Sequence, residues 1–389
     1  VIRLEQNYRS HGNILDAANA LIGHNTKRLG KSLWTDRGAG EPIRVYEAFT
    51  DSDEARWIVE EIQSLVRDGM SRSDIALLYR SNAQSRVLEH QLFSSGVAYR
   101  VYGGLRFFER QEVKHALAYL RLIANPDDDT AFTRVVNFPT RGIGARSLEA
   151  LQDAARTWNT PLYQTVPHLA GKPGAALGQF VALIERLRVE TRGLPLHETV
   201  DHVIEMSGLR GHYQLEKEGQ ERLENLDELI NAAANFSAEV GAGQAPGEAP
   251  SEPGSVLAEF LAHASLEAGD HQADAGSDAV QLMTVHAAKG LEFDVVFLSG
   301  LEEELFPHGN STEEADGLEE ERRLMYVGIT RARRTLLVTT LLRQKRQQQY
   351  TPQVPADVRK YQSLFRHQRH RSSLVPDCSP LRLPAFLPA

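Results

Sequence analysis

Residues 279–298 read AVQLMTVHAAKGLEFDVVFL, and this stretch decides the fold class. The runs at 279–285 and 293–298 are rich in β-branched residues, which favour strands. The connection between them contains small residues, the two alanines at 287 and 288 and Gly290. Small residues at a strand end let another backbone approach closely. Ligands of open α/β sheets collect at the carboxyl ends of strands. The stretch therefore predicts two strands of one sheet and a ligand-binding connection between them.

Strand and helix patterns alternate on both sides of a long central region. Ser10 is expected to cap a first helix, and Asp51, with Glu54 three residues later, to cap a second helix that Gly69 ends. Strands separated by helices favour crossover connections, and hence a parallel sheet covered on both faces. Further strands are predicted at 43–49, 75–79, 97–102 and 335–340, and helices at 14–22, 55–66, 84–93 and 319–327.

The central region loses the strand pattern and becomes helical. We therefore expect one α/β lobe built from residues 1–103 and 277–343, a helical insertion at 104–276, and an irregular basic, Pro-rich tail at 344–389. A Gly-, Ala- and Pro-rich segment at 241–254 is expected to be a mobile surface loop. Helices are predicted in the insertion at 113–123, 147–155, 177–187, 196–204, 222–234 and 256–264.

The composition points to a soluble multidomain protein. The chain has 389 residues, of which 41% are hydrophobic and 24% charged, and its longest apolar runs are far shorter than the roughly 20 residues that span a bilayer. The single cysteine, Cys378, excludes an internal disulfide framework and fits a reducing cytosol. We therefore expect a cytoplasmic protein with no membrane partner.

The net charge of -9 is unevenly distributed along the sequence. Residues 301–321 carry nine acidic residues and no lysine or arginine, whereas 331–371 carry eleven lysines and arginines against Asp357 alone. A local basic stripe can bind phosphate whatever the total charge, although it can equally be a solvated surface.

Three clusters carry recognisable chemistry: QNYRS at 6–10, TVHAAKGLEF at 284–293, and EEERRLMYVGITRARR at 319–334. Arg9, next to a helix start, suits a phosphate oxygen, and Tyr8 offers a flat face to a base. We expect Gly328 to end a helix and leave Arg331 free to reach across a cleft, as a finger that stabilises charge on a transferred phosphoryl group. Each cluster taken singly also fits plain surface.

Together, the three clusters resemble the fourth, fifth and sixth motifs of the UvrD/Rep/PcrA family of superfamily 1 DNA helicases. Residues 102–104 (YGG) and 107–110 (FFER) resemble the family's segment where the helical insertion begins. The likeness covers roughly residues 1–340. It implies that the α/β lobe is the second RecA-like lobe of a motor that hydrolyses ATP while it moves 3′ to 5′ along single-stranded DNA.

The resemblance also implies roles for individual residues. The implied catalytic residues are Arg9 and Arg331, which would touch the γ-phosphate. Tyr8 would stack on the adenine, Glu292 would bond the ribose, and Gln6 belongs to the same nucleotide site. Thr284, His286, Arg80 and Asn82 would meet single-stranded DNA, and the turn formed by Thr140, Gly142, Ile143 and Gly144 would hold the backbone of duplex DNA.

The 389 residues lack a phosphate-cradling P-loop. The only candidate is GKS at 30–32, but Asn25 stands where the pattern needs its first glycine. We therefore expect ATP and Mg²⁺ to depend on an N-terminal RecA-like lobe of the same polypeptide, which would hold the magnesium ligands, and we expect this chain alone to be inactive. DNA and repair proteins are the expected partners. A non-catalytic module that binds DNA and regulates a partner, and the helicase half of a recombination nuclease, are the alternatives.

Overall fold

The computed structural model describes residues 5–26, 30, 32–217, 219–243, 253–269, 277–309, 311 and 316–342. The chain divides into two compact units: Val1–Leu105 with His271–Ala389, called here the α/β unit, and Arg106–Asp270, called the helical unit. The predicted tail at 344–389 lies outside the described residues.

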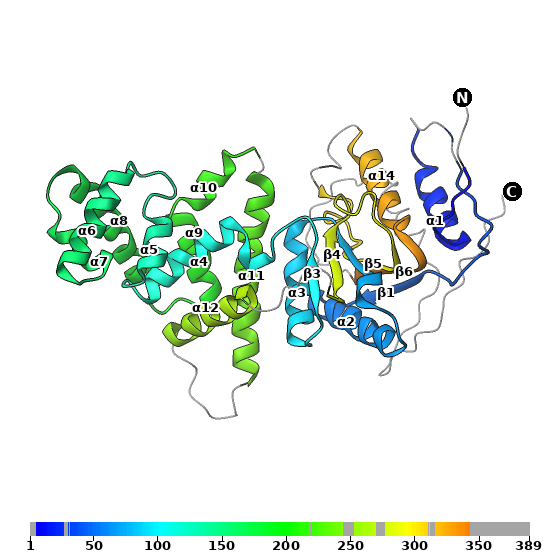
Figure 1. Ribbon diagram of the computed structural model, residues 1–389, viewed down its shortest axis with the longest axis horizontal. Helices are drawn as coiled ribbons and strands as arrows, with labels where there is room; N and C mark the ends of the chain where they lie inside the picture. Colours follow the sequence, from blue (N-terminus) through cyan, green and yellow to red (C-terminus); the bar gives the residue numbers. More distant parts are fainter. Residues whose placement is uncertain are drawn as a thin grey trace, which may run out of the picture. The chain divides into compact units, whose positions relative to one another are not determined.

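The α/β unit is built on a six-stranded, wholly parallel sheet in the order β1-β6-β5-β2-β4-β3 (Figure 1). Strands from before and after the helical unit interleave, since β2 lies between β5 and β4. This confirms the predicted α/β class. The strands are β1 (Arg44–Ala48), β2 (Ile75–Tyr79), β3 (Tyr99–Val101), β4 (Val280–Thr284), β5 (Phe293–Leu298) and β6 (Ala332–Leu341).

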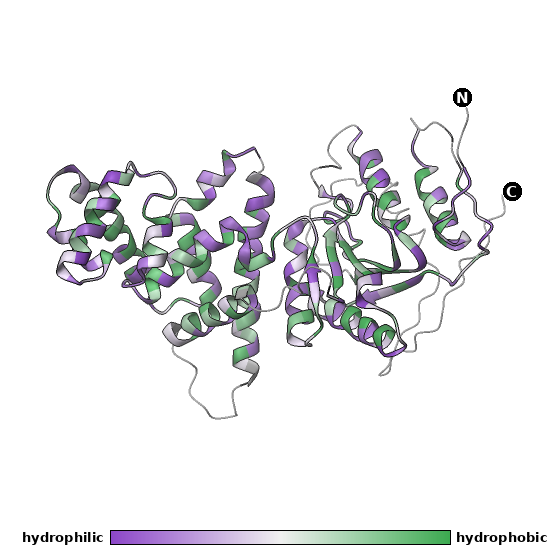
Figure 2. Ribbon diagram, viewed as in Figure 1, coloured by the Kyte–Doolittle hydropathy of each residue, from purple (hydrophilic) through white to green (hydrophobic). Residues whose placement is uncertain are grey.

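Both faces of the sheet are covered by helices. Successive side chains of a strand point to opposite faces, so neighbouring residues of one strand join different hydrophobic clusters. On β2, Ala76 and Leu78 join one hydrophobic cluster, which also contains buried residues of α1 (Gly12–Ile22) and α14 (Gly317–Ile329). Leu77 joins the opposite cluster, with buried residues of α2 (Asp51–Arg67) and α3 (Ser85–Ser94). Figure 2 shows the hydrophobic colour concentrated on the strands and on the helix faces that meet them. A continuous apolar strand is therefore what this central position requires.

The helical unit packs around α4 (Gln111–Ala124), which is buried on most of its surface. The sequence pattern located α4 and five further helices but missed the three shortest, α5, α7 and α10, because a helix of one or two turns shows too little periodicity. The other α-helices are α5 (Asp129–Val135), α6 (Ala145–Trp158), α7 (Leu162–Thr165), α8 (Gly171–Glu190), α9 (Leu196–Met206), α10 (Leu209–Gln214), α11 (Gly219–Gly243) and α12 (Pro253–Gly269).

The predicted N-terminal cap of α2 is wrong. The N-cap of α2 is Thr50, whose side chain accepts a hydrogen bond from the Asp53 amide, and not Asp51. Glu54 does not close a capping box: it is buried and accepts hydrogen bonds from the Gly300 amide and the Thr339 hydroxyl. Burial raises the pKa of Glu54 more than these two donors lower it.

The first helix and the loop of the insertion also differ from expectation. Ser10 does not cap α1, because His11 holds the N-cap position and the buried Ser10 hydroxyl donates to the Ala332 carbonyl, 2.6 Å away. Part of the segment expected to be a loop at 241–254 is helical, since α11 extends to Gly243 and α12 starts at Pro253. None of the described helices combines the length and the apolar character needed to cross a membrane.

Gly328 does not end its helix either, since α14 continues to Ile329. A Cβ atom at Gly328 would lie 2.8 Å from Leu298 Cδ2 and 3.3 Å from Val285 Cγ1, two buried side chains of the sheet region. The glycine therefore allows close contact between α14 and the sheet, and Arg331 follows at the end of this tightly packed helix.

We predict that Gly328→Ala destabilises the α/β unit. In an exposed helix interior, replacing glycine with alanine stabilises the helix by about 1 kcal/mol. Adding a methyl group to a filled core instead costs about 1–3 kcal/mol. The matched control is Gly178→Ala in α8, where an added Cβ meets nothing within 4 Å. Urea denaturation should show a lower unfolding free energy for Gly328→Ala and an equal or higher one for Gly178→Ala. Equal stabilisation by both substitutions would contradict the packing role of Gly328.

Candidate functional site

The residues of the predicted nucleotide site meet at the amino ends of β5 and β6. Glu292 directly precedes β5 and Arg331 directly precedes β6, and the Phe293 amide donates to the Arg331 carbonyl at 3.0 Å. The expectation of a site at carboxyl ends is wrong for this part of the 284–293 connection, because the connection itself returns the chain to the opposite edge of the parallel sheet.

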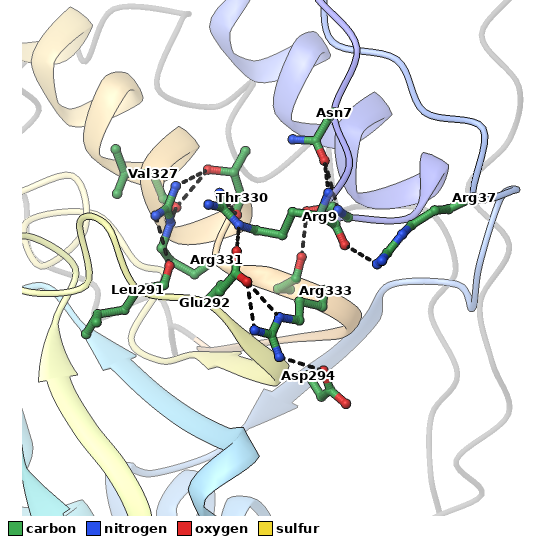
Figure 3. Close-up of polar contacts among 12 residues, drawn as sticks. Asn7, Arg9, Arg37, Leu291, Glu292, Asp294, Val327, Thr330, Arg331 and Arg333 are labelled. Carbon is green, nitrogen blue, oxygen red and sulfur yellow. Dashed lines mark hydrogen bonds and ion pairs between the residues drawn. The ribbon is translucent and has the colours of Figure 1, made fainter.

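Arg9 is held by a carboxylate and by the backbone around it (Figure 3). Its Nε donates to Glu292 Oε2, and its Nη1 donates to the Thr330 carbonyl at 3.3 Å. The Asn7 side chain accepts hydrogen bonds from the amides of Arg9 and Ser10, at 2.8 and 2.9 Å, and so fixes the turn that precedes α1. The backbone and the side chain of Arg9 are therefore both positioned.

Glu292 is shared between two arginines. Besides Arg9, it accepts two hydrogen bonds from Arg333, at 2.7 and 3.2 Å. The hydrogen bond from Arg9, followed by those from Arg333, lowers the pKa of Glu292 to about 2. The carboxylate is therefore ionised at neutral pH, and its charge is compensated twice.

Arg331 is not a free finger on a loop, contrary to the expectation from the sequence. Its Nε donates to the Val327 carbonyl and its Nη1 to the Leu291 carbonyl, both at 3.0 Å, and its Nη2 donates to the Thr330 hydroxyl at 3.2 Å. The reason is that α14 continues past Gly328, which brings Arg331 back over the last turn of the helix. The guanidinium is pre-positioned by carbonyls, which compensate only part of its charge.

Arg9 and Arg331 converge, although they stand at opposite ends of the sequence. Both guanidinium groups donate to Thr330, one to its carbonyl and one to its hydroxyl (Figure 3). Burial, and next the nearby charge of Arg9, lower the pKa of Arg331. Arg331 forms no ion pair with any residue that the structure describes. Two cations held this close to one shared neighbour are an arrangement that can bind a multiply charged anion.

Tyr8 and Gln6 lie on the same segment as Arg9. Tyr8 is 70% exposed, and its hydroxyl donates to Gln6 Oε1 at 2.8 Å. Gln6 pairs with Trp34 in an isolated bridge, and the Asn7 amide donates to the Trp34 carbonyl at 2.7 Å. The aromatic ring of Tyr8 is therefore presented to solvent from a supported backbone, which suits stacking on a base.

Three contributors to this cluster were missed from the sequence: Asn7, Arg333 and Arg37. Arg37 donates from Nη1 to the Arg9 carbonyl at 2.7 Å, and its own carbonyl contacts the His11 ring. Asn7 and Arg333 stand inside the quoted motifs, so an Asx turn and a second arginine could have been considered. Nothing in the sequence around Arg37 indicates its contact, which exists only because the 34–40 segment folds back along residues 7–13.

The predicted single-strand contacts lie at the other edge of the sheet, beyond the carboxyl ends of β2 and β4. Arg80 forms a bidentate pair with the buried Glu321 of α14, at 2.8–3.1 Å, so part of its donor capacity is already used. Asn82 starts a short 3-10 helix and is partly exposed. Thr284 ends β4, with its hydroxyl 3.3 Å from the Ala287 amide, and His286 is exposed. The structure therefore groups these four residues by edge, apart from the arginine cluster.

The predicted duplex-binding turn belongs to the helical unit, between α5 and α6. Thr140, Gly142 and Gly144 are exposed, and Gly142 has a φ of 74°, with nothing within 4 Å of an added Cβ. Ile143, in contrast, is buried, and its amide donates to Asn137 at 3.1 Å. The exposed backbone of this turn is open to a phosphate, whereas the Ile143 amide is already occupied.

Comparison with known proteins identifies the family of the chain. The profile of the UvrD-like helicase C-terminal domain matches residues 2–343. The chain is 53% identical over 346 residues to DNA helicase II of Escherichia coli, and 50% identical to DNA helicase II of Haemophilus influenzae. It is 42% identical over 353 residues to the ATP-dependent DNA helicase PcrA of Bacillus subtilis.

Each of these matches covers 87% of this chain but only 46–47% of the relative. The chain therefore spans about half the length of the curated relatives that it matches. Its parallel sheet, its helical second unit and its profile match agree, and the chain belongs to the family of UvrD-like helicase C-terminal domains.

Proposed function

We propose that this chain forms the second motor lobe of an ATP-dependent DNA helicase. The observation that carries the proposal is the convergence of Arg9 and Arg331 on Thr330, from opposite ends of the sequence. A γ-phosphate bound by both guanidinium groups would be the anion that this pair of cations needs. The relatives named DNA helicase II and ATP-dependent DNA helicase PcrA support the same interpretation.

The remaining residues of the cluster would complete the nucleotide site. Tyr8, exposed beside Gln6, would stack on the adenine, and Glu292 would reach the ribose. Arg9 donates to Glu292 from Nε and to Thr330 from Nη1, so the N–H groups of its Nη2 would be available to a phosphate. Arg333 would still neutralise Glu292 if the nucleotide also displaced the contact with Arg9.

The cluster fits a triphosphate but does not fit a magnesium ion. Its central carboxylate, Glu292, is engaged by two arginines, and the two guanidinium groups would repel a cation. Mg²⁺ and the P-loop contacts to the phosphates would come from an N-terminal RecA-like lobe of the same polypeptide. The part played by this chain is the charge stabilisation that an arginine finger supplies as the phosphoryl group is transferred.

DNA would run along the opposite edge of the sheet. Thr284 and His286, together with Arg80 and Asn82, would contact the single strand, and the turn at Thr140, Gly142, Ile143 and Gly144 would contact the duplex. We propose movement in the 3′ to 5′ direction, cytoplasmic action in DNA repair or replication, and repair proteins as further partners, on the strength of the family resemblance.

We predict that the purified 389-residue chain has no appreciable ATPase activity, with or without single-stranded DNA. Arginine fingers lower the barrier only when the phosphates are already held, and the sequence contains no G-x-x-x-x-G-K-[ST] pattern to hold them. A coupled assay of ADP release would check this. ATP turnover that Arg331→Ala abolishes in the isolated chain would show the prediction to be wrong.

The second prediction concerns Arg331 in a complete motor. The chain would replace the matched 346-residue part of the Escherichia coli DNA helicase II, to which it is 53% identical. In this chimaera Arg331→Ala should lower kcat about 10³-fold and leave ATP binding within a few fold, because the finger acts on charge that develops in the transition state.

Arg334→Ala is the matched control for Arg331→Ala. Arg334 is a neighbouring arginine whose side chain is 64% exposed and 3.9 Å from Asp294, and its loss should change kcat less than twofold. A single-turnover assay and a nucleotide-binding titration separate the two steps. Equal kcat values for the two variants would refute the finger role of Arg331.

A further inference from the structure

A groove of about 1010 Å³ lies in the helical unit, between α5 and α6, away from the glycine turn that joins these two helices. Figure 1 shows α5, α6 and α7 gathered in one part of this unit. His115 of α4 and the segment around Leu162 complete the groove. One face of each helix lines it, with Thr130, Thr133 and Arg134 from α5 and Gln152 and Arg156 from α6, and Asn159, the C-cap of α6, extends the lining. Residues three, four and seven apart share a helix face, so the lining is a continuous surface.

The groove contains two arginines whose charge is not neutralised by a buried ion pair with any described residue. Arg134 is exposed and forms neither a hydrogen bond nor an ion pair within the described part of the chain. Arg156 lies 3.6 Å from Asp153, but both side chains are more than three-quarters exposed, at 78% and 76%, so water screens this contact. The groove thus has two cationic side chains in a region, residues 104–276, that carries more acidic than basic residues.

The other lining groups offset only part of this charge. Asp129 is the one acidic residue among the described residues of the lining; its Oδ1 accepts the Leu162 amide at 2.8 Å, and its negative charge offsets one of the two arginines. His115 is 5% exposed, and its Nδ1 lies 2.8 Å from the Tyr213 hydroxyl. Burial, and next the charge of Arg134, lower its pKa to about 4, so it is neutral at pH 7. The remaining polar side chains are hydroxyls and amides, which can bond to an anion without adding charge.

The position of the groove on α6 relates it to the duplex-binding turn. Gly144 is the N-cap of α6, and Arg156 follows twelve residues later in the same helix. At 1.5 Å per residue this is about 18 Å along the helix axis. Double-stranded DNA carries one negative charge per about 1.7 Å of its length, so one short duplex can offer phosphates to the turn and to the groove together.

We propose that the α5–α6 groove binds the phosphodiester backbone of duplex DNA, with Arg134 and Arg156 on phosphates and the hydroxyl and amide side chains on neighbouring oxygens. The inference rests on the proposed function and deepens it, because it adds a second duplex contact to the one assigned to the turn. Side chains that meet only phosphates read no bases, so the contact is independent of sequence.

The test compares two double variants of the 389-residue chain with the same change in charge. Arg134→Gln with Arg156→Gln alters the groove. Arg186→Gln with Arg188→Gln alters α8, where the arginines pair with Glu190 and Glu185, at 3.4 and 3.0 Å. Binding of a fluorescein-labelled blunt duplex of about 20 base pairs is measured by anisotropy between 50 and 200 mM NaCl. Thermal melts of all variants check the fold.

The groove variant should bind the duplex on the order of tenfold more weakly than the unmodified chain at 150 mM NaCl. The slope of log K against log[salt] should become shallower by about 2, since each phosphate contact contributes about 0.9. The α8 variant should change affinity less than twofold. Arg134→Lys with Arg156→Lys keeps the charge and should bind the duplex like the unmodified chain, which separates charge from folding.

Three outcomes would overturn the proposal. The unmodified chain could fail to bind the duplex, or the groove and α8 variants could bind it equally. Polyglutamate could also displace the duplex as well as an unlabelled duplex does at the same charge, which would assign the groove to an acidic peptide. None of these results affects the motor assignment, which depends on Arg9 and Arg331 and is tested by ATP turnover in the chimaera.

Discussion

The position of β2 in the sheet is the constraint on which the α/β unit depends. Ala76 lies opposite Gln281 of β4 on one side and Val296 of β5 on the other, and all five residues of β2 are buried. An early segment of the chain thus completes the hydrogen bonding of two late ones, so the segments before and after the helical unit form one sheet. Without this pairing the two ends of the chain would have no shared framework, and the polar groups of three central strands would be left unpaired.

The arginine cluster is a consequence of that framework. It gathers Arg9, Arg331 and Arg333 around one carboxylate, Glu292, at the amino ends of β5 and β6. Like charges held close together oppose folding, and hydrogen bonds to carbonyls and to Glu292 offset only part of the repulsion. The structure tolerates the excess because the sheet and the packing of α14 against it fix the backbone next to Glu292 and Arg331. Excess positive charge held in place before a ligand arrives is what electrostatic preorganisation requires.

The proposed nucleotide contacts lie at the amino ends of the strands and the proposed single-strand contacts at the carboxyl ends. The helix α14 contacts residues at both. Its first half holds Arg80 through Glu321 at the edge of the candidate single-strand contacts, and its end leads into Arg331 at the edge of the candidate nucleotide contacts. Gly328 brings this helix close to the sheet, so the helix cannot shift without disturbing buried side chains of β5. In the helical unit, charge is again local, since the described lining of one groove has two arginines and one acidic residue in an otherwise acidic region.

The sequence by itself determined the helices and strands whose hydrophobic residues recur regularly or without interruption, and the motifs that these elements carry. The strands at Ile75–Tyr79 and Phe293–Leu298 were located to the residue, because a buried parallel strand is apolar on both faces whatever surrounds it. Tertiary structure alone decided which polar groups meet. Ser10 bonds Ala332, Glu54 bonds Thr339, Glu321 holds Arg80, and Arg37 supports Arg9. Each of these pairs joins residues distant in sequence, and a local pattern holds no information on distant partners. Local rules therefore assigned Ser10 and Glu54 to helix caps, although burial made a remote hydrogen bond the more favourable choice.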